Sequence, residues 1–173
     1  MVFKSNGKFL LTGEYLVLKG ATALALPLKK GQSLDVEILD SNDGLIHWDA
    51  FYKSTAQVQS SEFRVQSSNY HWFSAVLNKN DFSIKSTDDK EKAERLSDIL
   101  SKAKALNGNI FTEPHDYKFT THLDFDPQWG LGSSSTLINN VAEWAEINPY
   151  KLLDQTCKGS GYDIAGAKSI RPI

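Results

Sequence analysis

Several features that mark special classes of protein are scarce in this 173-residue sequence. It has one cysteine, Cys157, which excludes an intrachain disulfide and is typical of a reducing compartment. Its 19 basic and 21 acidic residues leave a formal net charge of −2, which gives no electrostatic reason to expect nucleic acid or an anionic membrane as a partner. We therefore expect a cytoplasmic protein with neither of these partners.

Long hydrophobic runs are also missing. The apolar stretch Phe9–Leu11 is interrupted at Gly13-Glu14, so it is neither a signal peptide nor a membrane-spanning helix. The four histidines are scattered and show no zinc-ligand spacing. What remains is an ordinary globular composition, 40% hydrophobic and 23% charged, in a chain long enough to bury a sizeable core.

The first half of the chain is patterned mainly as β-structure. In Ser33–Leu39, for example, apolar and acidic residues alternate as they do in a half-buried strand. Glycine, serine and asparagine separate the apolar runs. The predicted strands are Lys8–Leu11, Tyr15–Leu18, Thr22–Leu26, Ser33–Leu39, Leu45–Trp48 and Phe63–Val65.

The second half mixes helices with one more strand. Residues 88–106 predict a helix with aspartate caps at its start and Gly108 just past its end. Further helices are predicted for 69–77, after the serine cluster at 133–135, and from Asn148-Pro149 to about Gly159. Alternation over 117–123 predicts a strand. We expect one α+β domain over residues 1–173, made of a sheet layer and a helix layer.

The most informative segment is Trp129–Thr136, where a glycine-rich turn leads into a serine cluster and then a helix. Gly130 and Gly132 allow positive φ and close approach of the backbone to a ligand. Free amides and the positive end of the helix dipole make such a turn a phosphate site, and serine hydroxyls can ligate magnesium. A plain glycine turn with a serine N-cap is the alternative.

Two further segments carry candidate side chains. Lys8 begins an apolar strand, where its ammonium can contact a phosphate or a neighbouring hydroxyl, although a solvated strand-end lysine has the same pattern. Glu14 and Tyr15 follow a glycine at a strand junction, a common place for ligand-orienting side chains. Asp163 lies on a predicted glycine turn, where it can accept a proton from a substrate hydroxyl or merely form an Asx turn before a strand.

The order of these segments resembles one family. A GK…GEY pair near the start, GLGSS opening a helix, and SGYD about thirty residues later are similar to the GHMP kinases, which phosphorylate galactose, homoserine, mevalonate and phosphomevalonate. Glu14-Tyr15 after Gly13 is most similar to the mevalonate-pathway branch, and the string Gly161–Ala165, as Gly-Tyr-Asp-Ile-Ala, resembles a bacterial subgroup named for those letters. The resemblance implies the N-terminal domain of this family, with a fold similar to ribosomal protein S5 domain 2.

The resemblance also implies roles for the matching residues. The family's phosphate-binding loop would be Gly130, Leu131, Gly132, Ser133, Ser134 and Ser135, holding ATP, with Ser134 contacting Mg2+. Asp163 would be the catalytic aspartate and Lys8 the lysine that pairs with it. Glu14 and Tyr15 would bind substrate. The family's second magnesium-liganding acid has its nearest counterpart in Asp154, through a loose alignment.

The expected function is ATP-dependent phosphorylation of a small molecule at a hydroxyl or phosphate, in the mevalonate or phosphomevalonate kinase manner, with homoserine or a sugar as alternative acceptors. The alternative class is a non-catalytic nucleotide-binding or assembly module. Family members usually continue into a second domain with another glycine-rich motif, which we expect to be absent or truncated here. An exposed face where that domain would pack favours self-association as a homodimer.

Overall fold

The computed structural model describes residues 1–13, 19–56, 66–156, 161–169 and 171–173. Within these residues, six strands form one sheet in the order β1-β2-β6-β3-β4-β5. All neighbouring pairs are antiparallel except β3 and β6, which run parallel. The strands are β1 (Val2–Thr12), β2 (Leu24–Leu39), β3 (Leu45–Ala56), β4 (Gln66–Asn78), β5 (Ile84–Thr87) and β6 (Asp116–Leu123).

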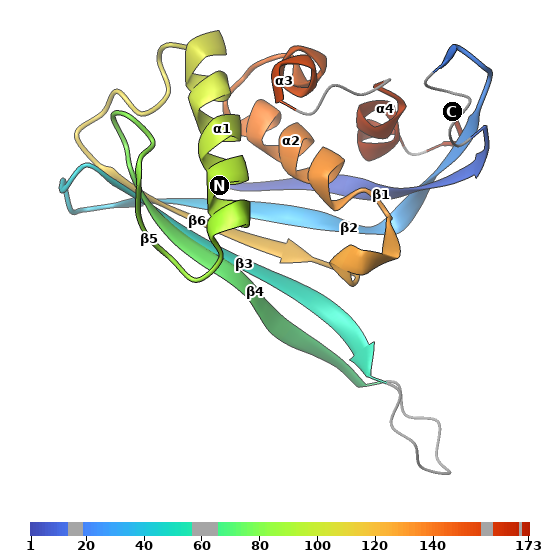
Figure 1. Ribbon diagram of the computed structural model, residues 1–173, viewed down its shortest axis with the longest axis horizontal. Coiled ribbons are helices and arrows are strands. Elements are labelled where there is room, and N and C mark those ends of the chain that lie inside the picture. Colours follow the sequence, from blue (N-terminus) through green and yellow to red (C-terminus); the bar gives the residue numbers. More distant parts are fainter. Residues whose placement is uncertain (14–18, 57–65, 157–160, 170) are drawn as a thin grey trace.

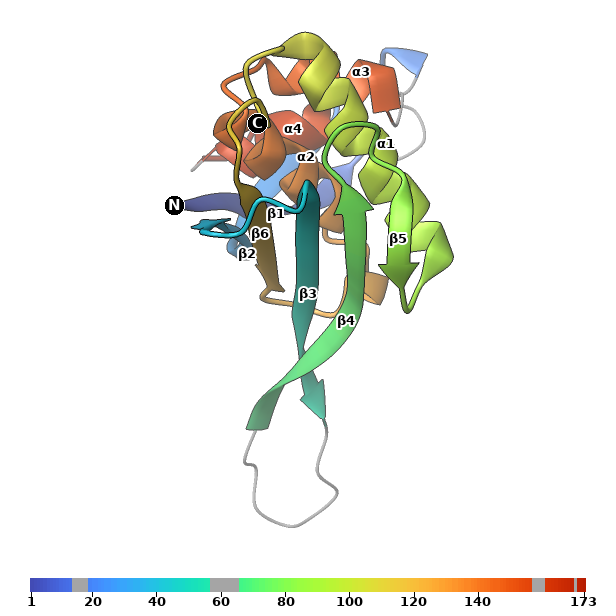
Figure 2. The same cartoon turned by 90° about the vertical axis from the view of Figure 1, so that its left-hand side faces the viewer.

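In the described ranges four α-helices cover one face of this sheet, which gives the two-layer α+β arrangement expected from the sequence (Figure 1). They are α1 (Lys90–Leu106), α2 (Ser133–Trp144), α3 (Pro149–Thr156) and α4 (Tyr162–Lys168). In the described part of the chain no helix covers the opposite face. Beyond the helical layer, β3 and β4 continue as a two-stranded ribbon that projects from the body (Figure 2).

An aromatic core joins the two layers. Trp48 of β3 stacks on Phe119 of β6 with ring centroids 5.2 Å apart. Trp144 of α2 meets Phe119 edge-on at 4.9 Å, and Phe111 packs between the helix layer and the sheet. Such edge-to-face contacts contribute about 0.5–1.5 kcal/mol per pair beyond the area they bury.

Polar groups dock α2 onto the sheet as well. Ser5 of β1 donates to Asn140 Oδ1 at 2.6 Å and accepts from Asn139 Nδ2 at 2.7 Å. Asn140 Nδ2 donates to the backbone carbonyl of Gln32 on β2 at 3.0 Å. Because these groups are buried, each bond avoids the cost of an unpaired polar atom, and together the bonds fix how α2 lies on β1 and β2.

The segment 69–77, predicted as a helix, is part of strand β4. Phe73, Ala75 and Leu77 alternate into the core as strand residues do. The register with β3 shifts between Ala50↔Phe73 and Phe51↔His71, so Trp72 is the extra residue of a β-bulge. Because Trp72 is inserted before Phe73, two aromatic residues are adjacent in the sequence. The apolar residues of the segment then have a spacing that is also typical of a helix.

Other boundaries differ less. The predicted strands 22–26 and 33–39 are one strand, β2, and the predicted strand at Lys8 is the second half of β1, which begins at Val2. Helix α1 ends where expected, and its start is capped by the Asp89 side chain. The predicted strands 15–18 and 63–65 lie outside the described residues. No helix in the described ranges combines the length and the hydropathy needed to cross a bilayer.

Candidate active site

The glycine-serine segment forms the turn expected of a phosphate site. Gly130 has φ 68° and Gly132 has φ 89°, both in the left-handed region. Gly132 caps α2 without any side-chain hydrogen bond, so the first-turn amides of residues 133–135 have no acceptor within the helix. These amides lie at the N-terminus of α2, which is the positive end of the helix dipole, and this arrangement favours binding of an anion there.

Glycine is required at position 132 for reasons of space. A Cβ there would lie 2.8 Å from Ser135 Oγ and 3.2 Å from Lys8 Cγ, in addition to the strain of positive φ. The turn is also anchored to β1, because the Lys8 amide donates to the Leu131 carbonyl at 2.9 Å. The lysine and the turn therefore hold fixed positions relative to each other.

The three serines are not equivalent. Ser135 is buried and its hydroxyl donates to the Gly132 carbonyl at 2.8 Å, so it closes the turn. Ser134 is exposed, and its hydroxyl makes no hydrogen bond with the described residues. Ser133 is half-buried and its hydroxyl likewise makes no hydrogen bond with the described residues, so the hydroxyls of Ser133 and Ser134 are both available to a metal ion or phosphate.

Lys8 and Asp163, 155 positions apart in the sequence, lie together as expected. Lys8 Nζ is 3.0 Å from Asp163 Oδ1, and the side chains are 13% and 31% exposed. This is an ion pair; no described group gives Oδ1 a well-directed hydrogen bond. Asp163 is in the first turn of α4 after Gly161, whose φ is 82°, and not in a turn before a strand. The glycine that predicted a turn is the helix cap.

Tyr162 completes the surroundings of the ammonium. Lys8 Nζ donates to the Tyr162 hydroxyl at 3.3 Å and lies 5.0 Å from the centre of its ring. Burial alone would lower the pKa of Lys8, but Asp163 and then Tyr162 outweigh it, so the pKa is raised above the ordinary 10.5. Lys8 is therefore a cation at every physiological pH.

The position of Lys8 depends on an irregularity in β1. Ser5 faces α2 and Lys8, three residues later, faces α4, although side chains three apart in a regular strand point to opposite faces. The register with β2 shifts between Asn6 and Lys8, and this shift brings the lysine to the helix-covered side. Gly166 of α4 leaves room for it, since a Cβ there would lie 3.1 Å from Lys8 Cβ.

These groups surround one cavity of about 370 Å³, here called the loop pocket. Both candidate catalytic residues and the turn face it. Its lining residues are Lys8, Arg95, Gly130, Gly132, Ser133, Ser134, Ser135, Ile138, Leu153 and Asp163.

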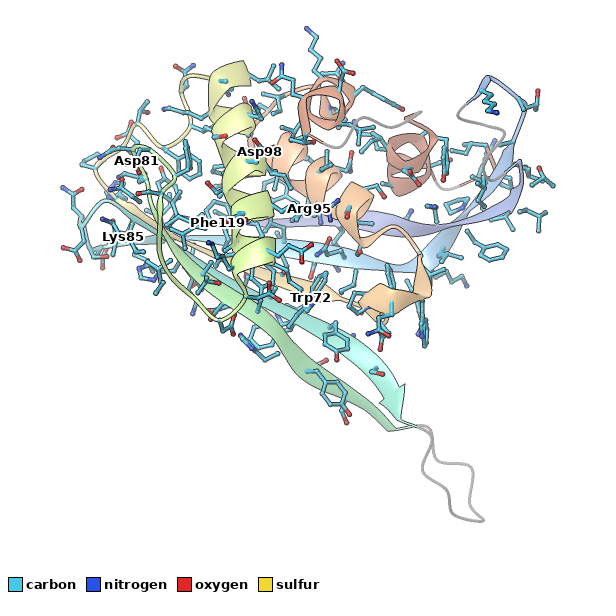
Figure 3. All side chains as sticks on the ribbon, viewed as in Figure 1. Trp72, Asp81, Lys85, Arg95, Asp98 and Phe119 are labelled. Carbon is cyan, nitrogen blue, oxygen red and sulfur yellow. The ribbon has the colours of Figure 1, made fainter. Side chains whose placement is uncertain are left out.

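A second cavity of about 240 Å³, the aromatic pocket, lies beside the first. The two share Arg95, Ser133 and Ser134. Figure 3 shows Arg95 extending from α1 toward the first turn of α2 and Trp72 rising from β4 below it. The lining also includes Gln32, Trp48, Phe73, Glu91, Lys92, Leu96, Ile99, Thr121, Pro127 and Leu137.

Some expected site residues stand apart from this arrangement. Asp154 is exposed on α3 and does not line the loop pocket. Within the described ranges no three His, Cys, Asp or Glu side chains are grouped as metal ligands. A magnesium ion here would depend on Ser134, Asp163 and phosphate oxygens, which fits the few protein ligands that Mg2+ takes. Glu14 and Tyr15 lie outside the described residues.

Sequence patterns did not single out Arg95, Gln32 or Thr121. Arg95 follows the ordinary charged positions of an amphipathic helix, and Gln32 and Thr121 look like polar residues in half-buried strands. Only the packing of α1 against the bulged β4 turns these positions into pocket walls.

No family model and no curated protein sequence matches the chain. Solved structures do resemble it. A Methanococcus jannaschii mevalonate kinase matches with a TM-score of 0.53 and 15% identity over 95% of this chain and 51% of its own. A Lactococcus lactis galactokinase, solved with galactose, matches with a TM-score of 0.59 and 13% identity over 97% of this chain and 39% of its own.

A putative sugar kinase from Campylobacter jejuni matches with a TM-score of 0.51 and 16% identity, over 95% of this chain and 48% of its own. These neighbours are GHMP kinases, and the fold expected from the resemblance is confirmed. The chain spans about half the length of the structures it matches or less.

Proposed function

We propose that the chain is the nucleotide-binding part of an ATP-dependent small-molecule kinase. The observation that carries this proposal is the Lys8–Asp163 pair facing the uncapped turn of α2 across one cavity. Phosphoryl transfer needs positioning and charge stabilisation more than covalent chemistry, and these are the elements that the cavity supplies.

Each group has a definite task in this proposal. The amides of residues 133–135 donate to triphosphate oxygens, and the Ser134 hydroxyl contributes to a magnesium site. Bound MgATP would supply the transferable phosphoryl group and charge neutralisation. The aromatic pocket, which shares Ser133 and Ser134 with the loop pocket, receives the base.

The acceptor side is formed by the ion pair. Asp163 accepts the proton of an acceptor hydroxyl or orients that hydroxyl, because its carboxylate faces the pocket. Lys8 donates one of its three N–H groups to Tyr162 and meets Asp163 as an ion pair, which leaves donor capacity for the reacting oxygen. Mevalonate and phosphomevalonate are the first acceptors to test, followed by homoserine and galactose.

Calorimetric titration with MgATP tests the donor site. We expect Gly132→Val to abolish measurable binding and Ser134→Ala to weaken it about tenfold, the equivalent of one lost hydrogen bond to a charged group. Gly44→Ala is the matched control, since Gly44 also has positive φ (75°) but nothing within 4 Å of an added Cβ. Equal affinity in the wild type and both loop variants would refute the donor site.

The non-catalytic module predicts a different result. It would bind MgATP with the same dependence on Gly132 and Ser134, yet Asp163→Asn would change no reaction rate, because there would be none to change. Assays of the wild type and Asp163→Asn against the four acceptors therefore separate the two classes.

A further inference from the structure

Two buried polar side chains line the aromatic pocket on strands β2 and β6, next to the strands that carry its tryptophans. Gln32 is 4% exposed and Thr121 is 1% exposed, and both border the cavity. Gln32↔Leu123 and Leu34↔Thr121 are paired in the β2–β6 register, so Gln32 and Thr121 are diagonal neighbours on one sheet face. Diagonal neighbours lie about 7 Å apart, which a single planar ring can bridge.

The protein leaves part of their hydrogen-bonding capacity unused. Gln32 Oε1 accepts from Thr136 Oγ1 at 2.8 Å, which directs the Nε2 donors elsewhere. Neither Gln32 Nε2 nor the Thr121 hydroxyl makes a hydrogen bond with the described residues. A ligand that covers these groups without pairing with them loses about 1–3 kcal/mol for each, so a ligand that does pair with them is selected.

The rest of the pocket suits a flat aromatic ligand. Trp48, Trp72 and Phe73 supply ring surfaces, and stacking of a base on such rings contributes about 1–3 kcal/mol. Ser133 and Ser134 connect this space to the amides of α2, so a base here can be continuous with phosphates there. The ligand class is therefore a purine nucleotide.

We propose that Gln32 and Thr121 are specificity-determining residues that bind the edge of the base. Gln32 Nε2 donates to a ring nitrogen, and Thr121 Oγ1 accepts from the neighbouring exocyclic amino group, which is the pattern that adenine presents. Gln32 also touches Thr136 in the first turn of α2, so the same side chain joins base recognition to the phosphate-binding turn. This inference rests on the proposed function.

The test is calorimetry with three probes: MgATP, the triphosphate of purine riboside, which lacks the 6-amino group, and inorganic tripolyphosphate. Thr121→Val keeps the side-chain shape and removes only the hydroxyl. We expect it to weaken MgATP about tenfold and to leave the purine riboside triphosphate within twofold. Gln32→Met should weaken both nucleotides about tenfold, and Thr121→Val, which does not touch the turn of α2, should not change the affinity for tripolyphosphate.

Thr120→Val is the matched control, because Thr120 lies between buried Phe119 and Thr121 on β6 and so faces the opposite side of the sheet. It should bind all three probes like the wild type. Unchanged MgATP affinity in Thr121→Val and Gln32→Met would overturn the inference while leaving the donor site standing. If the wild type binds neither MgATP nor tripolyphosphate, the proposed function fails and the inference fails with it.

Discussion

At the scale of single residues, the site depends on positions that accept few other residue types. Gly132 and Gly166 both border Lys8, and a Cβ at either would come within about 3 Å of a neighbouring side chain. The lysine thus lies in a slot with glycine on two sides and carboxylate at its end. Such confinement lowers the entropy that the side chain loses when it acts on a ligand.

The first residue-scale prediction concerns the ion pair. Lys8→Met keeps the apolar stem and removes the charge, leaving the Asp163 carboxylate without its cation. We expect a loss of about 1–3 kcal/mol in the free energy of unfolding at pH 7, measured by urea denaturation. Lys4→Met, at an exposed position of the same strand, should change stability by less than about 0.5 kcal/mol.

The pH dependence of that difference follows from the sign of the shift. The pKa of Lys8 is raised in the folded state, so the pair stabilises fully below the ordinary 10.5. The stabilisation is lost as the pH rises through the higher folded-state pKa. The gap between the wild type and Lys8→Met should therefore be constant from neutral pH to about 10 and shrink above it; a gap that widens there would contradict the pairing.

A second prediction concerns Asp116, at the end of the molecule far from the loop pocket. Burial would raise its pKa, but bonds from Leu45 N (2.8 Å), Ser41 Oγ (2.7 Å) and Asp43 N (3.1 Å) lower it to about 2. Asp116→Asn replaces an acceptor by an amide donor facing these groups. We expect about 1–3 kcal/mol lower stability at pH 7 by urea denaturation.

Because the folded-state pKa of Asp116 is depressed, its contribution is complete above the ordinary 3.8 and is lost as the pH falls toward 2. The wild type should therefore lose more stability than Asp116→Asn over that interval. Asp49→Asn removes a half-exposed partner 3.9 Å from Lys118 and serves as control, with an expected change within about 0.5 kcal/mol. Equal acid sensitivity in wild type and Asp116→Asn would show that other carboxylates dominate.

At the scale of elements, the predictable parts are those where local pattern and local structure coincide. The aspartate cap, the apolar face and the end of helix α1 can all be recognised in the sequence. The glycine-serine turn was equally predictable, because glycine is the residue that most readily adopts the positive φ found at 130 and 132. Lys8 and Asp163 were candidates from their own segments, the resemblance implied that they pair, and the structure confirms the contact.

What could not be predicted depends on partners distant in the sequence. The bulge at Trp72 exists only in the pairing of β4 with β3, and without it the segment has the pattern of a helix. The stretch Lys4–Asn6 of β1 is polar in sequence, yet Ser5 is buried because α2 supplies its hydrogen bonds. The aromatic pocket is likewise defined by α1, β2, β4 and β6 together.

At the scale of the whole molecule, the sheet is covered by helices on one side and its loop pocket is open. Asp163 is 31% exposed and Ser134 is exposed, so water reaches both ends of the proposed reaction. Phosphoryl transfer needs water excluded and both reactants fixed. Binding and turnover should therefore separate in this chain.

We accordingly predict that the 173-residue chain binds MgATP but phosphorylates mevalonate or phosphomevalonate slowly, at less than about 0.1 per second against a typical enzyme value of about 10 per second. A coupled assay with those two acceptors, homoserine and galactose measures this. Asp163→Asn controls for contaminating kinases and should abolish whatever rate is found. Turnover near the typical value would show that the open pocket is sufficient by itself.

Because of the register shift between Asn6 and Lys8, the site tolerates substitutions in this part of β1 better than insertions or deletions. An insertion or deletion of one residue between Ser5 and Lys8 would turn the ammonium to the helix-free face, although every residue type of the site would still be present. Related proteins with one residue more or fewer at this point in β1 would then be inactive, even where the glycine-serine turn and Gly161–Ala165 are intact.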